Sequence, residues 1–221
     1  MNFHEIKKAF TLAEVLVTLT IIGVIAAISI PTLLQSTNNA EAKTQWKQNY
    51  AIMSQAINKM IMDTADDFVE YRENTSSFEP LLRTYFNYVK DDPAMGLYHR
   101  DLLAATYKDL SGAPMRGELM DDGQIILSNG ALIMIENYSV NGAPLIIWVD
   151  INGFEKGPNI LGKDLFGGEV VDDKRLVPIG NNTVTQIDCD CSKTPCQITK
   201  WAGYGSFNLA GAGCSADYLS K

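Results

Sequence analysis

The stretch FTLAEVLVTLTIIGVIAAISIPTLL, residues 10–34, decides the architecture of this chain. It contains a single charged side chain, Glu14. A helix rises about 1.5 Å per residue, so roughly 20 apolar residues cross a bilayer and this stretch is long enough. Lys7 and Lys8 precede it, and by the positive-inside rule they keep the N-terminus in the cytoplasm. The sequence therefore predicts a single-pass membrane protein whose C-terminal part is exported.

Two simple interpretations of the apolar stretch, a cleaved secretory signal peptide and a plain membrane anchor, do not account for all of its features. A secretory signal peptide has a core of about 7–15 apolar residues that ends at a small-x-small cleavage site, whereas this run is longer and continues into IPTLLQSTNNAEAK. A plain membrane anchor does not need Glu14, which costs a few kcal/mol inside a bilayer. A buried carboxylate is either protonated or paired. The position of Glu14 therefore predicts a specific partner.

The segment KKAFTLAEVLVTLTIIGVIAAISIPTL resembles the class III signal sequence of type IV pilins and type II secretion pseudopilins. The shared pattern is a short basic leader, a small residue, Phe, a Glu at the fifth mature position and an apolar helix. The resemblance implies a leader of residues 1–9, cleavage between Ala9 and Phe10 by a prepilin peptidase, and N-methylation of Phe10. The family usually has Gly at the position of Ala9. This difference is expected to affect how efficiently the leader is cut more than where it is cut.

The resemblance also implies assembly roles for Glu14, Gly23 and Pro31. It implies that Glu14 pairs with the terminal amine of a neighbouring subunit, since such charges attract strongly at low dielectric. On this reasoning the carboxylate is unsatisfied in the isolated subunit and satisfied in the filament. Pro31 lacks an N–H, and Gly23 is a second weak point in the helix. They predict either a simple kink or local unwinding between them on assembly.

After the apolar stretch the helix is predicted to continue as an amphipathic one over residues 35–64. Its apolar side chains recur at steps of four and three, on one helical stripe: Trp46, Tyr50, Met53, Ile57 and Met60. We expect the stripe to pack on the protein's own head, residues 65–221, with an aromatic-lined ligand groove as the alternative. The expected fold class is α+β and pilin-like, with a long N-terminal helix packed on a small antiparallel sheet.

Shorter elements are predicted inside the head. A helix is expected over residues 78–89, with another turn or two at residues 102–107. Asn129-Gly130 lies between two apolar runs, which is the strongest short signal for a β-hairpin. A third apolar run at residues 144–151 predicts a third antiparallel strand.

One segment has the composition of a calcium loop. Its oxygen-bearing side chains are mixed with glycines: Asp150, Asn152, Glu155, Asn159 and Asp164. Calcium takes about six to eight oxygen ligands on a flexible loop, and the segment looks loosely similar to the calcium loop of some major pseudopilins. The EF-hand pattern is absent. The alternative interpretation of this segment is a glycine-rich surface turn without a metal. Calcium at this loop is the one cofactor that the sequence suggests.

The four cysteines lie close to the C-terminus at positions 189, 191, 196 and 214. Zinc would be considered in a cytosolic protein, but an exported segment predicts two disulfides. Four cysteines allow three pairings. A bond between Cys189 and Cys191 would close a very small ring, so each is expected to pair with Cys196 or Cys214. The bonds would staple a loop-rich tail, or bound a surface loop that contacts neighbours, as in many pilins.

Charge and motif content argue against other classes of function. Lysine and arginine number 18 against 26 acidic residues, a net charge of -8, which disfavours a nucleic-acid-binding protein. Two histidines exclude a three-histidine metal site. His99 and Asp101 could serve a nucleophile, but no nucleophile elbow, P-loop or GxGxxG accompanies them. We expect no enzyme, and His99 as a surface or helix-capping residue.

The sequence thus predicts a structural subunit of a type IV pilus-like or type II secretion pseudopilus filament. Its partners would be copies of itself or related pilins. It would occupy the cytoplasmic membrane before assembly and an extracytoplasmic filament afterwards. A minor tip pilin that binds a ligand, and a membrane-anchored exported enzyme, stay open as alternatives.

Overall fold

The computed structural model describes most of the chain and divides it into two compact units, residues 1–41 and 42–221. The described residues are 10–73, 75–92, 98–137, 145–180, 191–192, 194, 196–198 and 207–220.

Helix α1 (Leu12–Thr64) begins in the first unit and runs without interruption through Pro31. Its apolar side chains between residues 12 and 34 are exposed; Leu12, for example, is 78% exposed and Leu33 65%. A window of 18 residues has a mean hydropathy of 2.3, which by length and composition suffices to cross a membrane. An apolar surface of this extent requires a cover of lipid or protein. The long N-terminal helix predicted from the sequence is confirmed.

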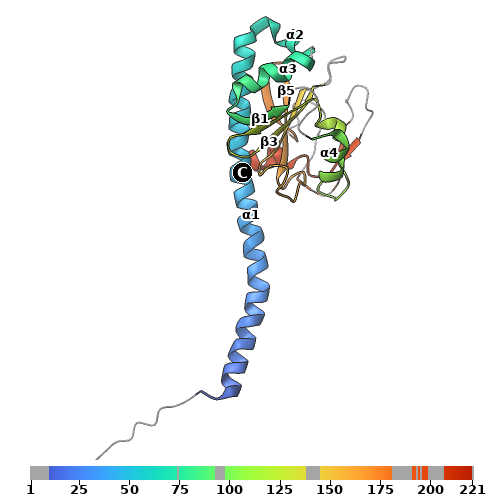
Figure 1. Cartoon of the computed structure of the whole chain (residues 1–221). Helices are drawn as coiled ribbons and strands as arrows, with labels where there is room; N and C mark the ends of the chain where they lie inside the picture. Colours follow the sequence, from blue (N-terminus) through green and yellow to red (C-terminus); the bar gives the residue numbers. More distant parts are fainter. Residues whose placement is uncertain are drawn as a thin grey trace, which may run out of the picture. The chain divides into compact units, whose positions relative to one another are not determined.

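The second unit contains the end of α1 together with the head, in which all other elements lie (Figure 1). The helices after α1 are η1 (Ala65–Asp67), α2 (Phe68–Glu73), α3 (Thr75–Leu82), η2 (Arg83–Tyr85), α4 (Arg100–Thr106), η3 (Gly117–Leu119) and α5 (Cys214–Ser220). The strands are β1 (Tyr88–Asp92), β2 (Gly123–Leu127), β3 (Leu132–Asn137), β4 (Leu145–Asp150), β5 (Leu165–Val171), β6 (Arg175–Pro178), β7 (Cys196–Ile198) and β8 (Phe207–Leu209).

Six of these strands form one antiparallel sheet in the order β1-β2-β3-β4-β5-β6. Sequential order with antiparallel pairs is a meander, in which each strand pairs with the next one along the chain. The predicted hairpin at Asn129-Gly130 joins β2 to β3, and Gly130 has a φ of 89°, a left-handed conformation that favours glycine. The predicted α+β class with an antiparallel sheet is therefore confirmed, with six strands where three were expected.

One face of the sheet packs against the second half of α1 (Figure 1). The predicted stripe supplies this contact: Trp46, Met53, Ile57 and Met60 are fully buried. Tyr50 is half-buried and donates its hydroxyl to the carbonyl of Leu176 at 2.9 Å. The stripe thus packs on the protein's own head, as expected.

The opposite face of the sheet is covered as well, which the sequence did not reveal. Trp148 and Met134 point to this side and pack with Leu103 of α4 and with Tyr107. Every residue of β3 and β4 is buried as a consequence. Burial on both faces explains why these strands read as continuous apolar runs and not as alternating ones.

The helix predicted over residues 78–89 is wrong in its second half. Helix α3 ends at Leu82, and residues 88–92 form the edge strand β1. Tyr88 pairs with Leu127 of β2, and the pairing overrides the local helical pattern. The second predicted helix, at residues 102–107, is confirmed as α4.

Within the described part of the C-terminal segment, residues 214–220 form helix α5, where a loop-rich tail was expected. The Ser215 carbonyl of this helix accepts the indole N–H of Trp46 at 2.9 Å. The Ser215 hydroxyl oxygen accepts the backbone N–H of Gly167 in β5, also at 2.9 Å. Helix α5 therefore links α1 to the sheet through one buried residue.

Candidate functional site

The start of α1 is a reciprocal hydrogen-bonded cap made by Thr11 and Glu14. The backbone N–H and the hydroxyl of Thr11 each donate to Oε2 of Glu14 at 2.8 Å. The backbone N–H of Glu14 donates back to Oγ1 of Thr11 at 3.2 Å. A threonine at the N-cap and a glutamate three residues later form a capping box. The expectation that the Glu14 carboxylate is unsatisfied in the isolated subunit is therefore wrong.

The cap is compatible with removal of the leader. Both donors belong to Thr11, whose N–H remains a peptide amide if the chain is cut between Ala9 and Phe10. Both hydrogen bonds use Oε2, and within the described part of the chain Oε1 accepts none. Phe10 is 85% exposed, while Ala9 lies outside the described residues. The capped carboxylate thus retains one oxygen for a further donor.

The remaining predicted assembly residues, Gly23 and Pro31, both lie within the uninterrupted α1. A Cβ atom added at Gly23 would meet no other atom within 4 Å. The hydroxyls of Thr18, Thr20 and Thr32 donate to carbonyls three or four residues earlier, so the helix satisfies these polar groups itself. Local unwinding between Gly23 and Pro31 on assembly stays a prediction.

The predicted calcium loop is organised around two buried carboxylates. Asp150 accepts the Tyr107 hydroxyl at 2.7 Å and the backbone N–H groups of Asn152 and Gly153 at 3.2 and 3.0 Å. Burial raises the pKa of Asp150 to about 6, against the lowering effect of these donors. Burial and the nearby Asp150 charge also raise the pKa of Tyr107. Asp150 and Tyr107 thus form one coupled buried pair.

The second carboxylate, Asp164, accepts the backbone N–H groups of Asn159 and Ile160, both at 2.7 Å. Of the other candidates, Glu155 is exposed, whereas Oδ1 of Asn152 and Oδ1 of Asn159 are buried and accept no hydrogen bond from the described residues. Buried amide oxygens without donors are ligands that a hard cation accepts. The loop's donor set fits calcium in part, and calcium binding stays a prediction.

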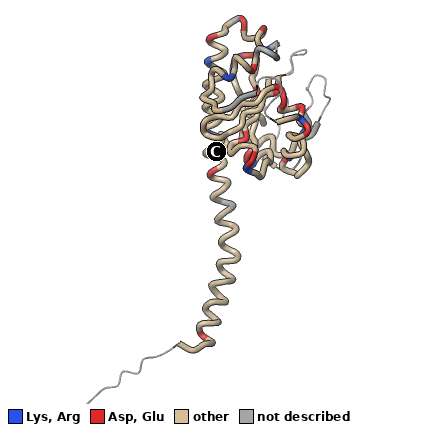
Figure 2. The backbone as a smooth tube through the Cα atoms, viewed as in Figure 1, with Lys and Arg blue, Asp and Glu red and all other residues tan. Residues whose placement is uncertain are grey.

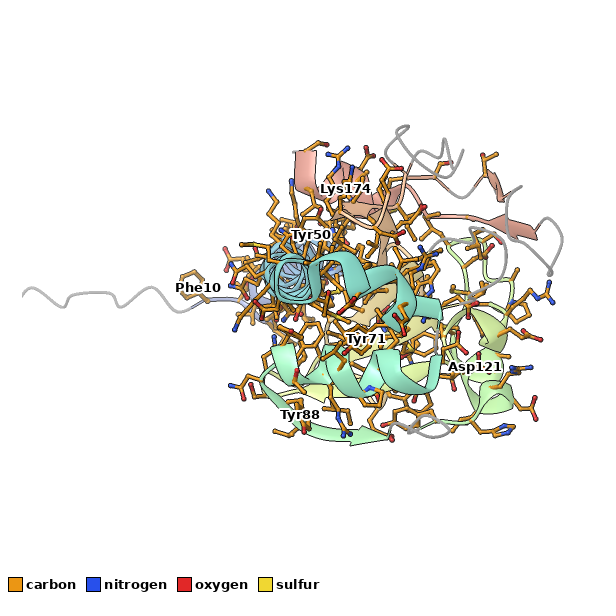
Figure 3. All side chains as sticks on the ribbon, turned by 90° about the horizontal axis from the view of Figure 1, so that it is seen from above. Phe10, Tyr50, Tyr71, Tyr88, Asp121 and Lys174 are labelled. Atoms are coloured by element: carbon orange, nitrogen blue, oxygen red, sulfur yellow. A yellow bond between two sulfur atoms is a disulfide. The ribbon has the colours of Figure 1, made fainter. Side chains whose placement is uncertain are left out.

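A second acidic group was missed in the sequence. Carboxylate oxygens of Asp121, Asp122 and Glu136 lie within 4.8 Å of one another. Nε of Arg100 donates to Asp121 at 2.6 Å, and the backbone N–H of Asn137 donates to Asp122 at 2.8 Å. Figure 3 shows Asp121 on the side of the head away from Tyr50. Arg100 offsets part of the negative charge of this group. Because Arg100 is the first residue of α4 and Glu136 lies in β3, the group connects α4 to the sheet.

His99 is the N-cap of α4, where Nδ1 accepts the backbone N–H of Asp101 at 3.4 Å. This confirms the prediction of a helix-capping role. The pair is exposed on the surface of the head.

The cysteine prediction is confirmed for one bond. Cys191 and Cys214 form a disulfide that joins two residues 23 positions apart. It is one of the pairings that the sequence left open, and it attaches the start of α5 to the chain before β7. Cys189 lies outside the described residues, as does the side chain of Cys196. Their pairing stays a prediction.

Comparison with known proteins identifies one feature. The family model for the prokaryotic N-terminal methylation motif matches residues 6–30. This match shows a signal of the type IV pilin and pseudopilin type, as the sequence predicted, and supports a protein of that class. No curated protein and no solved structure matches the chain.

Proposed function

We propose that this chain is a structural subunit of a filament of the type IV pilus or type II secretion pseudopilus kind. It is cut between Ala9 and Phe10, methylated at Phe10, and assembled through α1. The observation that carries the proposal is the coincidence of two features. The methylation motif covers residues 6–30, and the same stretch of helix exposes its apolar side chains on every side.

An apolar helix of this kind has two stable environments. In the membrane its side chains contact lipid, and in a filament they contact the same helices of neighbouring subunits. Transfer between the two replaces one apolar contact by another, so the apolar side chains alone give little preference. A polar contact that exists only in the filament supplies the preference, and Glu14 is the charged residue placed to make it.

The capping box positions that contact. Thr11 holds Oε2 of Glu14 at the first turn of α1, which fixes the direction of the carboxylate. The cationic amine of a neighbouring Phe10 is proposed to bind Oε1. A charged pair of this kind gains most where water is excluded. Pairing would set the axial position of each incoming subunit relative to the one before it.

The proposal also gives the location of each part of the subunit. The N-terminus stays in the cytoplasm, α1 anchors the subunit in the membrane, and the head is exported. The disulfide between Cys191 and Cys214 supports an exported head, because such bonds persist outside the reducing cytoplasm. No catalytic role is part of the proposal.

Mass spectrometry of the N-terminus of the full chain, purified from its producing cells, tests the proposal. The expected species begins at a methylated Phe10. Ala9→Gly restores the residue usual in the family and should be cut at least as well, whereas Ala9→Arg should block cutting. An intact residue 1, or a cut after the apolar stretch, would overturn the proposal.

A further inference from the structure

The disulfide between Cys191 and Cys214 packs directly against the loop that follows β4. A Cβ atom added at Gly162 of this loop would lie 2.6 Å from Sγ of Cys214, closer than a real side chain tolerates. Gly162 also has a φ of 84°, a left-handed conformation that favours glycine. The sulfur of Cys214 therefore fills the space beside Gly162, and only a glycine at this position lets the loop backbone reach the disulfide.

The contact is reciprocal, because a second glycine lies on the cysteine side. Gly211, whose φ is 85°, comes shortly before Cys214, and its carbonyl accepts the backbone N–H of Cys214 at 3.1 Å. A Cβ atom added at Gly211 would lie 2.8 Å from the carbonyl oxygen of Leu161. The turn at residues 211–214 and the loop at Gly162 thus interlock backbone against backbone.

Hydrogen bonds extend this contact to a third segment of the chain, which follows α4. The backbone N–H of Leu161 donates to the carbonyl of Lys108 at 2.9 Å, and that of Lys108 donates to the carbonyl of Asn159 at 3.0 Å. The backbone N–H of Leu110 donates to the carbonyl of Ala210 at 2.9 Å. These segments close a ring of contacts, which we call the clamped unit: residues 107–113, 159–164 and 209–214.

Reduction of the disulfide changes the space that its two sulfurs need. Bonded sulfurs lie about 2 Å apart, whereas unbonded heavy atoms in contact need about 3.5–4 Å. Cys214 is fully buried, and the backbone at Gly162 leaves its sulfur no free space on that side. Protein interiors are close-packed and transmit such displacements. Separating the two sulfurs therefore displaces the loop at Gly162.

We propose that the disulfide between Cys191 and Cys214 is a redox-sensitive clamp. The oxidised chain holds the clamped unit shut, and reduction releases the loop at residues 159–164. In closing, the two thiols pass their protons and two electrons to an exchanging disulfide, which leaves as two thiols, and one S–S bond forms. A dithiol reverses the step and is itself oxidised to a disulfide. Cys191 is half-buried, which gives the reductant access to the bond.

The clamp controls how much acidic surface the head presents. Asp150 and Asp164 are buried, and both accept backbone N–H groups of the loop. Figure 2 shows that the acidic positions of the described chain lie mainly in the head, and release of the loop admits water to these two carboxylates as well. Disulfides persist outside the reducing cytoplasm, so the shut form belongs to an exported head. The clamp goes beyond the proposed function and rests only on contacts within the head.

Hydrogen exchange of the full chain in detergent micelles, followed by mass spectrometry, tests the clamp. Complete reduction with dithiothreitol, a dithiol, should accelerate exchange of the amides of Lys108, Leu110 and Leu161 by roughly tenfold or more. Amides of β3 and β4 should keep their rates. Unchanged rates in the clamped unit would overturn the proposal. Equal acceleration in β3 and β4 would overturn it too, because the bond would then hold the whole head.

Cys191→Ser assigns the effect to this one bond. Without reductant, the variant should show the exchange pattern of the reduced parent chain, because it lacks the bond but retains Cys214 beside Gly162. A variant that keeps the protection of the oxidised parent chain would refute the clamp, even if dithiothreitol accelerates exchange in that parent.

Gly162→Ala tests the contact while the disulfide stays intact. The added methyl group meets Sγ of Cys214, so exchange in the clamped unit should accelerate several-fold in the oxidised chain. Gly130→Ala is the matched control, because Gly130 has a similar φ of 89° but no atom within 4 Å of the added Cβ. Equal effects of the two substitutions on the clamped unit would contradict the proposed contact. If Gly162→Ala does not fold, the comparison with Cys191→Ser decides alone.

Discussion

Thr11 and Glu14 hold the first turn of α1 by donating to each other, backbone to side chain in both directions. The carboxylate expected to await a partner from another subunit already has one within its own chain. In the proposed assembly, Glu14 therefore gains a second donor, and no isolated charge has to be rescued.

Thr11→Val is expected to loosen the first turn of α1. The substitution removes the hydroxyl that both donates to and accepts from Glu14, and loss of an N-cap side chain costs about 1 kcal/mol. Amide hydrogen exchange of residues 13–15 in detergent micelles should accelerate roughly five-fold for such a loss. Thr11→Ser keeps the hydroxyl and serves as the control. Unchanged exchange in the valine variant would show that the cap contributes nothing.

Glu14→Ala is expected to leave export and leader removal intact and to reduce incorporation into filaments. In the proposed function the peptidase recognises the chain around Ala9 and Phe10, whereas the filament contact uses the carboxylate of Glu14. The measurement is the ratio of sheared filament protein to membrane-bound subunit, with the mature N-terminus checked by mass spectrometry. Glu14→Asp, which shortens the side chain but keeps its charge, should retain more incorporation. Equal incorporation of the alanine variant and the parent chain would remove Glu14 from the mechanism.

The stability of the head is expected to depend on pH through Asp150. Its pKa rises from 3.8 to about 6 in the folded protein, mainly because of burial. The folded state then holds this proton more tightly than the unfolded state, so the group's contribution becomes less favourable as pH rises from about 4 to 6. At 1.36 kcal/mol per pKa unit, the charged form costs about 3 kcal/mol above pH 6.

Asp150→Asn tests this dependence. The amide can still accept the N–H groups of Asn152 and Gly153, and the Tyr107 hydroxyl can turn to accept from it. Urea denaturation should show a variant more stable than the parent at pH 7, with the difference disappearing towards pH 4. Glu155→Gln, at an exposed position in the same loop, should show no such trend. A variant that is destabilised equally at both pH values would refute the burial argument.

The disulfide between Cys191 and Cys214 is expected to contribute to stability. It closes a loop of 23 residues, for which chain entropy gives about 3 kcal/mol. Cys191→Ser is the cleaner variant because Cys191 is half-buried, whereas Cys214 is fully buried and its replacement also disturbs packing. The urea midpoint measures the loss. Peptide mapping without reduction should recover the Cys191–Cys214 pair, and its absence would contradict the pairing.

Calcium is expected to bind the loop at residues 150–164 through oxygens that include Oδ1 of Asn159. Titration of the full chain in detergent should raise the temperature of unfolding, and magnesium is the matched control ion. Asn159→Gly tests the site while tolerating the positive φ of 56° at this position. The variant should lose the calcium response. An identical unfolding temperature with and without millimolar calcium would end this prediction.

The sequence was most informative where one local pattern decides the structure. The apolar stretch, the stripe from Trp46 to Met60 and the turn at Asn129-Gly130 each predicted an element that the structure confirms. Strand β5 was missed because Gly167 and Gly168 argue against a strand. A Cβ atom at Gly167 would lie 2.5 Å from Ile179 and 2.8 Å from the Trp148 ring, so only the folded neighbourhood explains this glycine.

The candidate site was predicted only in part from the sequence. The identity of Glu14 follows from its spacing after Phe10, yet its partner Thr11 was overlooked, although Thr11 and Glu14 have the spacing of a capping box. The group formed by Asp121, Asp122 and Glu136 could not be found, because it depends on the register of β2 and β3. Strand β1 was missed for the same reason, since its pairing with β2 is a long-range contact.

The hydrogen bond between Trp46 and Ser215 spans 169 positions of the chain. The packing around this tryptophan is therefore complete only once the chain extends to Ser215. A chain broken off before Ser215 would lack the acceptor for the indole N–H and leave the apolar stripe of α1 open to proteases. Resistance of the folded unit to a protease thus reports whether synthesis has passed that residue.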